Sequence, residues 1–131
     1  MRAYLDSCIV IYLVEENEPW HGPVTQAIQA ATDFDLLASD LVRMECLVRP
    51  WRDGNAKLAD DFTEFLGRYD CAGLNAATFD MAARLRAVSR LRTPDALHLA
   101  CAIEQHCDEF WTNDHRLDRV DIRLRVRVFG Q

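Results

Sequence analysis

The strongest structural signal in the sequence lies at residues 92–102, which read RTPDALHLACA. Thr93 is a favourable N-cap, and Pro94 fits the first helical position, where a missing N–H costs nothing. Because nearly every residue from Ala96 onward is apolar, the stretch predicts a helix that is buried on most sides. Asp95 is the single carboxylate in its first turn. An acid there suits the helix dipole, so Asp95 by itself is explained by helix stability as well as by function.

Around this helix, short apolar stretches alternate with longer segments of helical character. The alternation predicts an α/β fold in a single domain over residues 1–131, with a parallel sheet flanked by helices on both faces. The predicted strands are 2–6, 35–39, 71–74, 109–112 and 122–129. The predicted helices are 8–14, 24–32, 40–49, 55–69, a segment that begins at Asn75, and 93–106, with breaks at 19–23 and 50–54.

Composition and charge are those of an ordinary globular chain. Half of the 131 residues are hydrophobic and 27% are charged, which suits one domain with its own core. The net charge of −6 argues against a general nucleic-acid coat protein, but it does not exclude a nuclease, whose active site is itself acidic. The five cysteines contain no Cys-x-x-Cys pair, so neither a disulfide framework nor a zinc ribbon is indicated. With no leader-like N-terminus and no apolar run of membrane-spanning length, we expect a cytoplasmic protein without a membrane contact.

Four acids stand where the predicted fold can bring them together. Asp6 ends the first strand, Asp114 follows the fourth, and Asp95 opens the helix that leads into the fourth. In open parallel sheets, sites form beyond the carboxyl ends of the strands, where the strand order reverses. Glu45 falls four residues after Leu41 and so shares the apolar face of its helix. An inward-facing acid needs a partner or a metal, although an edge position that still reaches water explains Glu45 equally well.

Four like charges in one crevice repel one another and persist only if a positive charge neutralises them. Oxygen-only ligands select a hard cation such as Mg²⁺ or Mn²⁺. Such an ion suits phosphodiester hydrolysis, because it activates water and stabilises the charge that develops on phosphate. The sequence contains no glycine-rich phosphate loop, and its local order suggests no Ser-His or Cys-His nucleophile pair.

Taken in order, these pieces resemble the PIN domain family, and the size and layout of the chain are similar to VapC-type toxins of prokaryotic toxin–antitoxin pairs. The resemblance covers the whole chain. The pieces that carry it are Tyr4-Leu5-Asp6-Ser7, Glu45, Pro94-Asp95-Ala96-Leu97-His98-Leu99-Ala100 and Thr112-Asn113-Asp114.

The resemblance implies a five-stranded parallel sheet in the order 3-2-1-4-5 and the activity of a metal-dependent endoribonuclease. It implies that Asp6, Glu45, Asp95 and Asp114 are catalytic. Asp6 and Asp95 would be the most direct ligands of Mg²⁺ or Mn²⁺, and Asp114 would complete the metal site. It also implies an RNA substrate, a small antitoxin protein as partner, and a homodimer.

Two other functions fit the same pattern. The fold also serves housekeeping RNA processing, which the sequence does not separate from a toxin's activity. A catalytically silent domain that binds RNA or protein is the other alternative; loss of an acid would favour it, and all four acids are present.

Several neighbouring residues can be interpreted either as structural or as functional. His98 is predicted to be a hydrogen-bonded buried histidine rather than a proton-transfer group. Asp118 is predicted to form a surface ion pair with Arg116 or Arg119, rather than to be a fifth acid. The hydroxyls of Ser7 and Thr112 can cap the chain or orient a carboxylate. A rim that binds the RNA backbone is a hypothesis for four arginines: Arg84, Arg86, Arg90 and Arg92.

Overall fold

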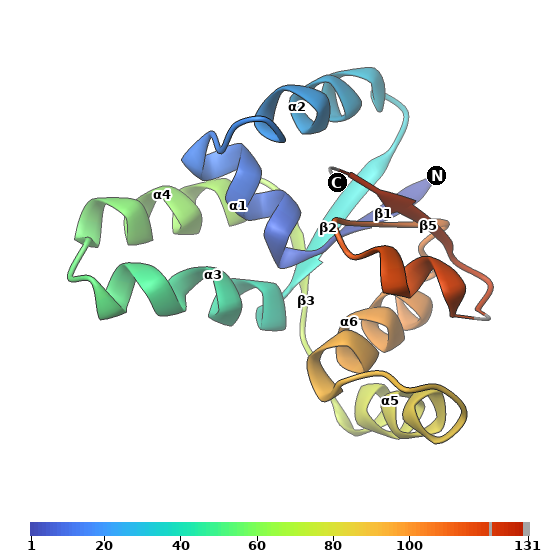
Figure 1. Ribbon diagram of the computed structural model, residues 1–131. Coiled ribbons are helices and arrows are strands. Elements are labelled where there is room, and N and C mark those ends of the chain that lie inside the picture. The colour runs from blue at the N-terminus through green and yellow to red at the C-terminus, as the bar shows by residue number, and fades with distance from the viewer. Residues whose placement is uncertain (121, 130–131) are drawn as a thin grey trace.

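Strands and helices alternate along the chain as the sequence predicts, in a computed structural model that describes residues 1–120 and 122–129 (Figure 1). The elements in chain order are β1 (Arg2–Leu5), α1 (Ser7–Glu15), α2 (His21–Ala30), β2 (Asp35–Ser39), α3 (Asp40–Arg52), α4 (Ala56–Leu66), β3 (Asp70–Ala72), α5 (Ala76–Val88), α6 (Thr93–Glu104), β4 (Glu109–Thr112), the 3-10 helix η1 (His115–Arg119) and β5 (Arg125–Val128).

The five strands form one parallel sheet in the order β3-β2-β1-β4-β5, which confirms the predicted topology. Figure 1 shows α1 to α4 gathered on one side of the sheet and α5 and α6 on the other. The chain leaves β1 toward β2 and β3, and it returns to β4 on the opposite side of β1. The strand order therefore reverses between β1 and β4, and their carboxyl ends define the expected position of a site.

The two central strands carry the core. Ala3, Tyr4 and Leu5 of β1 are completely buried, as are Phe110 and Trp111 of β4, because helices cover both faces of the sheet. Strand β5 lies at the edge, and its exposed arginines alternate with partly buried valines, as the sequence pattern predicts.

The structure corrects the predicted start of α6. Thr93 is not its N-cap but its first helical residue, and the cap position belongs to Arg92, which makes no side-chain capping bond. The Thr93 hydroxyl is used elsewhere, because Oγ1 accepts a hydrogen bond of 3.0 Å from Arg86 Nη1. Pro94 is therefore the second helical residue rather than the first, still within the first turn.

Two other helix boundaries, both near a proline, differ from the prediction by three residues. Helix α3 continues through the buried Pro50 to Arg52, and the chain turns at Gly54, whose φ of 66° suits glycine. A proline near the end of a helix removes one hydrogen bond, and here the helix ends one turn later than the sequence indicates. Helix α2 begins at His21 rather than at residue 24, because Gly22 and Pro23 are accommodated in its first turn.

Among the helices of the described residues, none combines the length and apolar character that crossing a lipid bilayer requires.

Candidate active site

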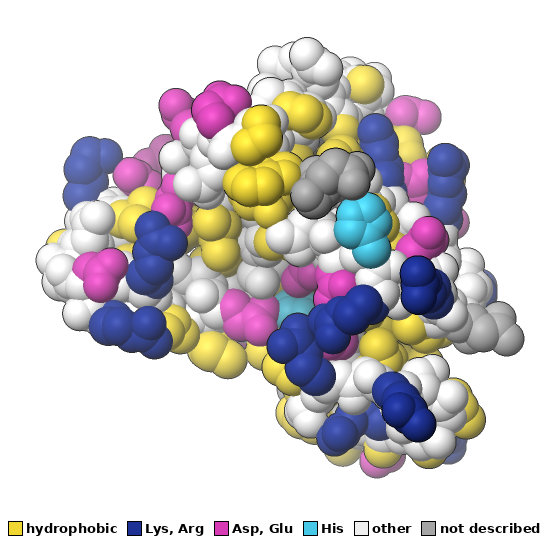
Figure 2. Space-filling model, in the orientation of Figure 1, with side chains coloured by type: hydrophobic (Ala, Val, Ile, Leu, Met, Phe, Trp, Pro, Cys, Tyr) yellow, Lys and Arg dark blue, Asp and Glu magenta, His cyan; other side chains and the backbone are white. Residues whose placement is uncertain are grey.

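The four predicted acids line one cleft, which lies beyond the carboxyl ends of β1 and β4. Its volume is about 290 Å³. Figure 2 shows acidic side chains gathered in a hollow near the middle of this face, with a histidine at its floor and basic side chains along one rim. The structure therefore brings together Asp6, Glu45, Asp95 and Asp114.

Asp6 is held in one orientation by groups at the ends of both central strands. Its backbone N–H donates to the carbonyl of Trp111 at 3.0 Å, which fixes the residue beside β4. Its side chain caps α1: Oδ1 accepts from the backbone N–H of Ser7 at 2.8 Å. Oδ2 accepts from the Thr112 hydroxyl at 2.7 Å. Both carboxylate oxygens thus have fixed positions before any ligand binds.

Glu45 leans into the cleft from the middle of α3. Its Oε1 accepts a hydrogen bond from the Ser7 hydroxyl at 3.0 Å and lies 2.6 Å from His98 Nε2. The side chain is 28% exposed, so the carboxylate reaches the cleft while hydrogen bonds from Ser7 and the buried His98 fix its position. Both alternatives left open for Glu45 hold in part, because the carboxylate has hydrogen-bond partners and also reaches water.

His98 is buried at 3% exposure, and both of its ring nitrogens have partners, which confirms the prediction of a hydrogen-bonded buried histidine. Nδ1 lies 2.7 Å from the Tyr4 hydroxyl, which lies 2.7 Å from Ser39 Oγ. An ionised carboxylate only accepts, so Nε2 must donate to Glu45, and a neutral ring then accepts at Nδ1 from Tyr4. Burial raises the pKa of Tyr4 well above its ordinary value, which keeps the proton on the tyrosine.

Asp95 and Asp114 occupy the other side of the cleft and share one cation. Arg116 Nη2 lies 2.5 Å from Oδ2 of Asp114 and 3.7 Å from Oδ2 of Asp95. Arg92 Nε adds a second contact to Asp95, at 3.2 Å. Because the Arg116 side chain is 61% exposed, the ion pair is open to water and contributes little to stability.

This arrangement corrects the prediction for Asp118. Arg116 pairs with Asp114 and Asp95, and within residues 1–120 and 122–129 neither Arg116 nor Arg119 pairs with Asp118. Asp118 is exposed and lies outside the residues that line the cleft.

The pKa values of two of the four carboxyls are lowered, which favours their ionised form. Partial burial by itself would raise the pKa of Glu45, but the hydrogen bonds from His98 and Ser7 outweigh that effect and hold it below the ordinary value. Hydrogen bonds from the Arg116 side chain lower the pKa of Asp114, despite its partial burial. Both groups are therefore negatively charged at neutral pH.

The donor set fits a hard divalent cation, because four carboxylates from different elements converge on one cleft. Ligand atoms of three residues, Asp6, Glu45 and His98, lie within 4.8 Å of one another. The predicted ligands Asp95 and Asp114 line the same cleft, where their oxygens are turned toward Arg116. His98 already donates to Glu45 through Nε2, so the oxygens are the better candidates for ligands.

The sequence does not predict that Tyr4 and Ser39 support the acids from the protein interior. Tyr4 and Ser39 look like ordinary strand residues, and their link to His98 depends on the pairing of β1 with β2. Ser7 and Thr112 have the orienting role that the sequence left open beside capping, because their hydroxyls contact Glu45 and Asp6.

Comparison with known proteins gives a family and a set of similar structures. The PIN domain family model matches residues 3–123. VapBC2 from Rickettsia felis, bound to a promoter DNA fragment, has a TM-score of 0.82 at 16% identity, over 99% of this chain and 100% of that one. A toxin–antitoxin complex from Klebsiella pneumoniae has a TM-score of 0.78 at 20% identity, over 96% of each chain. Mycobacterium tuberculosis VapC20, a sarcin–ricin loop cleaving toxin, has a TM-score of 0.75 at 13% identity, over 94% of this chain and 98% of that one.

A search of curated proteins found no match to this chain. The structural matches, at 20% identity or less, establish a shared fold. The family model is decisive, because it covers nearly the whole chain, including all four acids of the cleft. This chain belongs to the PIN domain family.

Proposed function

We propose that this protein is an endoribonuclease that depends on Mg²⁺ or Mn²⁺, and that it is the toxin of a toxin–antitoxin pair. One observation carries the proposal: four carboxylates from four different parts of the chain line one cleft at the reversal of strand order. Four acids in one place repel one another. Arg92 and Arg116 pair with Asp95 and Asp114, whereas within residues 1–120 and 122–129 Asp6 and Glu45 pair with no arginine or lysine, so a further cation fits there.

Asp6, Asp95 and Asp114 would hold the ion, with Glu45 beside them. Carboxylate oxygens are the ligands that Mg²⁺ and Mn²⁺ prefer. When bound, such an ion lowers the pKa of water and stabilises negative charge on a reacting phosphate.

The chain's own residues prepare the cleft for this chemistry. Thr112 and the Ser7 N–H fix both oxygens of Asp6, and His98 fixes Glu45 in its ionised form. Preset positions matter because a displaced carboxylate loses much of its catalytic effect. Arg116 pairs with Asp95 and Asp114, and its side chain is 61% exposed. Such a guanidinium is suited to a phosphate of the substrate as well as to carboxylates.

The similar structures support the choice of substrate and partner. One of them is described as a toxin that cleaves the sarcin–ricin loop, and others are toxin–antitoxin complexes. By extension we propose that this protein acts on RNA and that a small antitoxin protein restrains it. A homodimer stays a prediction of the family resemblance, to be checked by measuring the mass of the purified protein in solution.

The test is cleavage of a pool of structured and single-stranded RNA by antitoxin-free protein. The reactions contain Mg²⁺, Mn²⁺ or a chelator, and wild type is compared with Asp6→Asn. We expect fragments only with metal and only from wild type. Fragments that persist in the chelator or in Asp6→Asn would overturn the proposal. No fragments from a folded wild type would favour the silent binding domain.

A further inference from the structure

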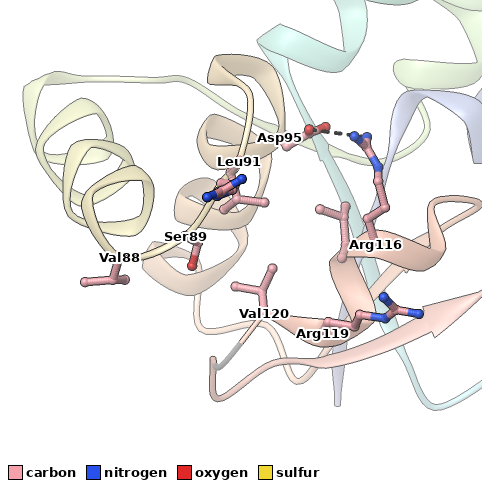
Figure 3. Close-up of a pocket in the computed structure, with 9 residues that line it drawn as sticks. Val88, Ser89, Leu91, Asp95, Arg116, Arg119 and Val120 are labelled. Carbon is pink, nitrogen blue, oxygen red and sulfur yellow. Dashed lines mark ion pairs between the residues drawn. The ribbon is translucent and has the colours of Figure 1, made fainter.

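A second cavity opens directly beside the acidic cleft. Its volume is about 530 Å³, within the usual range for small-ligand sites. One wall is the end of α5 and the connection to α6, and the other wall is η1 with the residue that follows it (Figure 3). We call it the arginine cavity; its lining is Val88, Ser89, Arg90, Leu91, Asp95, Arg116, Leu117, Arg119 and Val120.

The arginine cavity and the acidic cleft share a boundary. Asp95 lines both, and Figure 3 shows its ion pair with Arg116 at the edge of the cavity. A strand of RNA whose reacting phosphate lies among the four acids would therefore place its next nucleotide at this cavity. The two hollows are therefore adjacent, with Asp95 on their common boundary.

The charge of the arginine cavity is opposite to that of the cleft. Its lining holds three arginines and one acid. Arg90 and Arg119 are exposed, and among residues 1–120 and 122–129 neither forms an ion pair. Exposed guanidinium groups in a concave site are suited to phosphate, which they bind through two parallel hydrogen bonds.

The remaining lining is aliphatic except for Ser89. Leu91 and Leu117 are buried, so the accessible aliphatic surface comes from Val88, which is 83% exposed, and from the partly buried Val120. Arg86 fixes the α5–α6 connection, because its Nε donates to the Leu91 carbonyl at 3.0 Å and Nη1 donates to the Thr93 hydroxyl. A wall of aliphatic groups with a rim of cations matches a nucleotide, whose base is flat and apolar on its faces and whose phosphate is charged.

We propose that the arginine cavity is a nucleotide subsite: it holds the nucleotide next to the cleaved bond, with a phosphate on Arg119 and Arg90 and the base against the aliphatic wall. The proposal deepens the nuclease function and rests on it for the position of the cleaved bond. An acidic peptide is the competing occupant. RNA is favoured because the cavity continues the cleft and offers a base-sized apolar wall that a string of carboxylates does not need.

The test measures RNA binding without cleavage, so that it is independent of the nuclease activity. Dye-labelled single-stranded oligouridylate and oligoadenylate are titrated with wild type, Arg119→Gln and Arg52→Gln in chelator over a range of salt concentrations. Arg52 is an exposed arginine at the end of α3, outside both cavities, and serves as the matched control. A lost phosphate contact on single-stranded nucleic acid lowers the slope of log K against log salt by about 0.7.

We expect this reduced slope in Arg119→Gln and the wild-type slope in Arg52→Gln. A slope in Arg119→Gln equal to that of wild type, or no RNA binding by wild type, would overturn the proposal. Oligoglutamate is titrated in the same way. If Arg119→Gln loses oligoglutamate binding while its RNA binding is unchanged, the cavity belongs to an acidic peptide and the proposal is overturned. A reduced slope in a protein that cleaves no RNA would support the subsite while contradicting the nuclease proposal.

The base contact has its own readout. Ser89 lies in the cavity wall, and Ser89→Trp fills the space where the base would lie. With randomised RNA, sequencing of the fragments should show an altered base preference at one position beside the cleaved bond for Ser89→Trp, and none for Arg52→Gln. Identical preferences in all three proteins would contradict the assignment of the base to this wall.

Discussion

The hydrogen-bond chain through His98 leads to a prediction that separates its two nitrogens. His98 contacts Tyr4 through Nδ1 and Glu45 through Nε2, both from a buried ring. A glutamine amide reaches the position of Nε2, and an asparagine amide reaches the position of Nδ1. His98→Gln should therefore keep the bond to Glu45 and lose the one to Tyr4, whereas His98→Asn should do the reverse.

The two losses differ in size. In His98→Gln the Tyr4 hydroxyl keeps Ser39 as a partner, so the cost is that of one neutral hydrogen bond, about 0.5–1.5 kcal/mol. In His98→Asn the ionised Glu45 loses its donor, and a hydrogen bond to a charged group contributes about 1.5–3 kcal/mol. Glu45 retains Ser7 and partial exposure, which places the loss near the lower end of that range. Asparagine is also smaller than the ring and leaves a cavity, which adds to its cost.

The assay is urea unfolding at neutral pH, followed by circular dichroism. We expect both variants to be less stable than wild type, with the free energy of unfolding lower in His98→Asn than in His98→Gln by about 1 kcal/mol. His115→Asn is the control, because His115 is exposed on η1, and it should lie within about 0.5 kcal/mol of wild type. If His98→Asn is as stable as His98→Gln, the assignment of Nε2 as the donor to Glu45 is wrong.

Three further predictions follow from the charges in the cleft. Arg116→Gln should raise the pKa of Asp114 toward its ordinary value of 3.8, as measured by NMR titration of the carboxyl carbon; an unmoved pKa would contradict the shared ion pair. The folded-state pKa of Glu45 is lowered, so its contribution to stability is complete above about pH 4.5 and is lost as the pH falls through the folded value. Unfolding free energy should therefore fall less steeply with acid in Glu45→Gln than in wild type, and equal slopes would refute this. Mn²⁺ at a hundred times its Kd should stabilise wild type by about 2.7 kcal/mol and leave Asp6→Asn unchanged in a thermal melt, whereas equal stabilisation would place the ion elsewhere.

The sheet and the meeting of the acids follow from local sequence signals. Asp6 directly follows a short apolar strand, Asp114 lies two residues after the end of another, and Asp95 follows a proline that marks a helix start. These signals depend only on residues that are close in sequence, so they can be recognised without knowledge of the tertiary structure. The reversal of strand order then brings the three residues to one edge of the sheet.

The residues that pair with the acids are set by tertiary contacts, which cannot be predicted from the sequence. Arg116 has acids on both sides along the chain, and only the path of η1 decides that it reaches Asp114 and Asp95 rather than Asp118. Thr93 has the right chemistry for an N-cap, but Arg86 from the preceding helix takes its hydroxyl. The partner of a long side chain depends on which groups lie near it in the tertiary structure, and helical periodicity does not predict this.

The arginine cavity lies beyond sequence reasoning for the same reason. The sequence suggests one basic rim for the arginines before α6, but the structure gives three of them separate contacts: Arg86 holds the α5–α6 connection, Arg92 contacts Asp95, and Arg90 lines the cavity. The other wall comes from η1, whose approach to this connection no pattern in the chain predicts.

The proposed function requires the carboxylates of the cleft to cleave RNA with a divalent metal. The most direct measurement is the single-turnover cleavage rate of one RNA in Mn²⁺ by wild type, Asp95→Asn and Asp60→Asn, where Asp60 is an exposed acid of α4 outside the cleft. We expect Asp95→Asn to lose cleavage while it remains folded, since a repelling charge is removed, and Asp60→Asn to match wild type. Equal rates for folded Asp95→Asn and wild type would contradict the account.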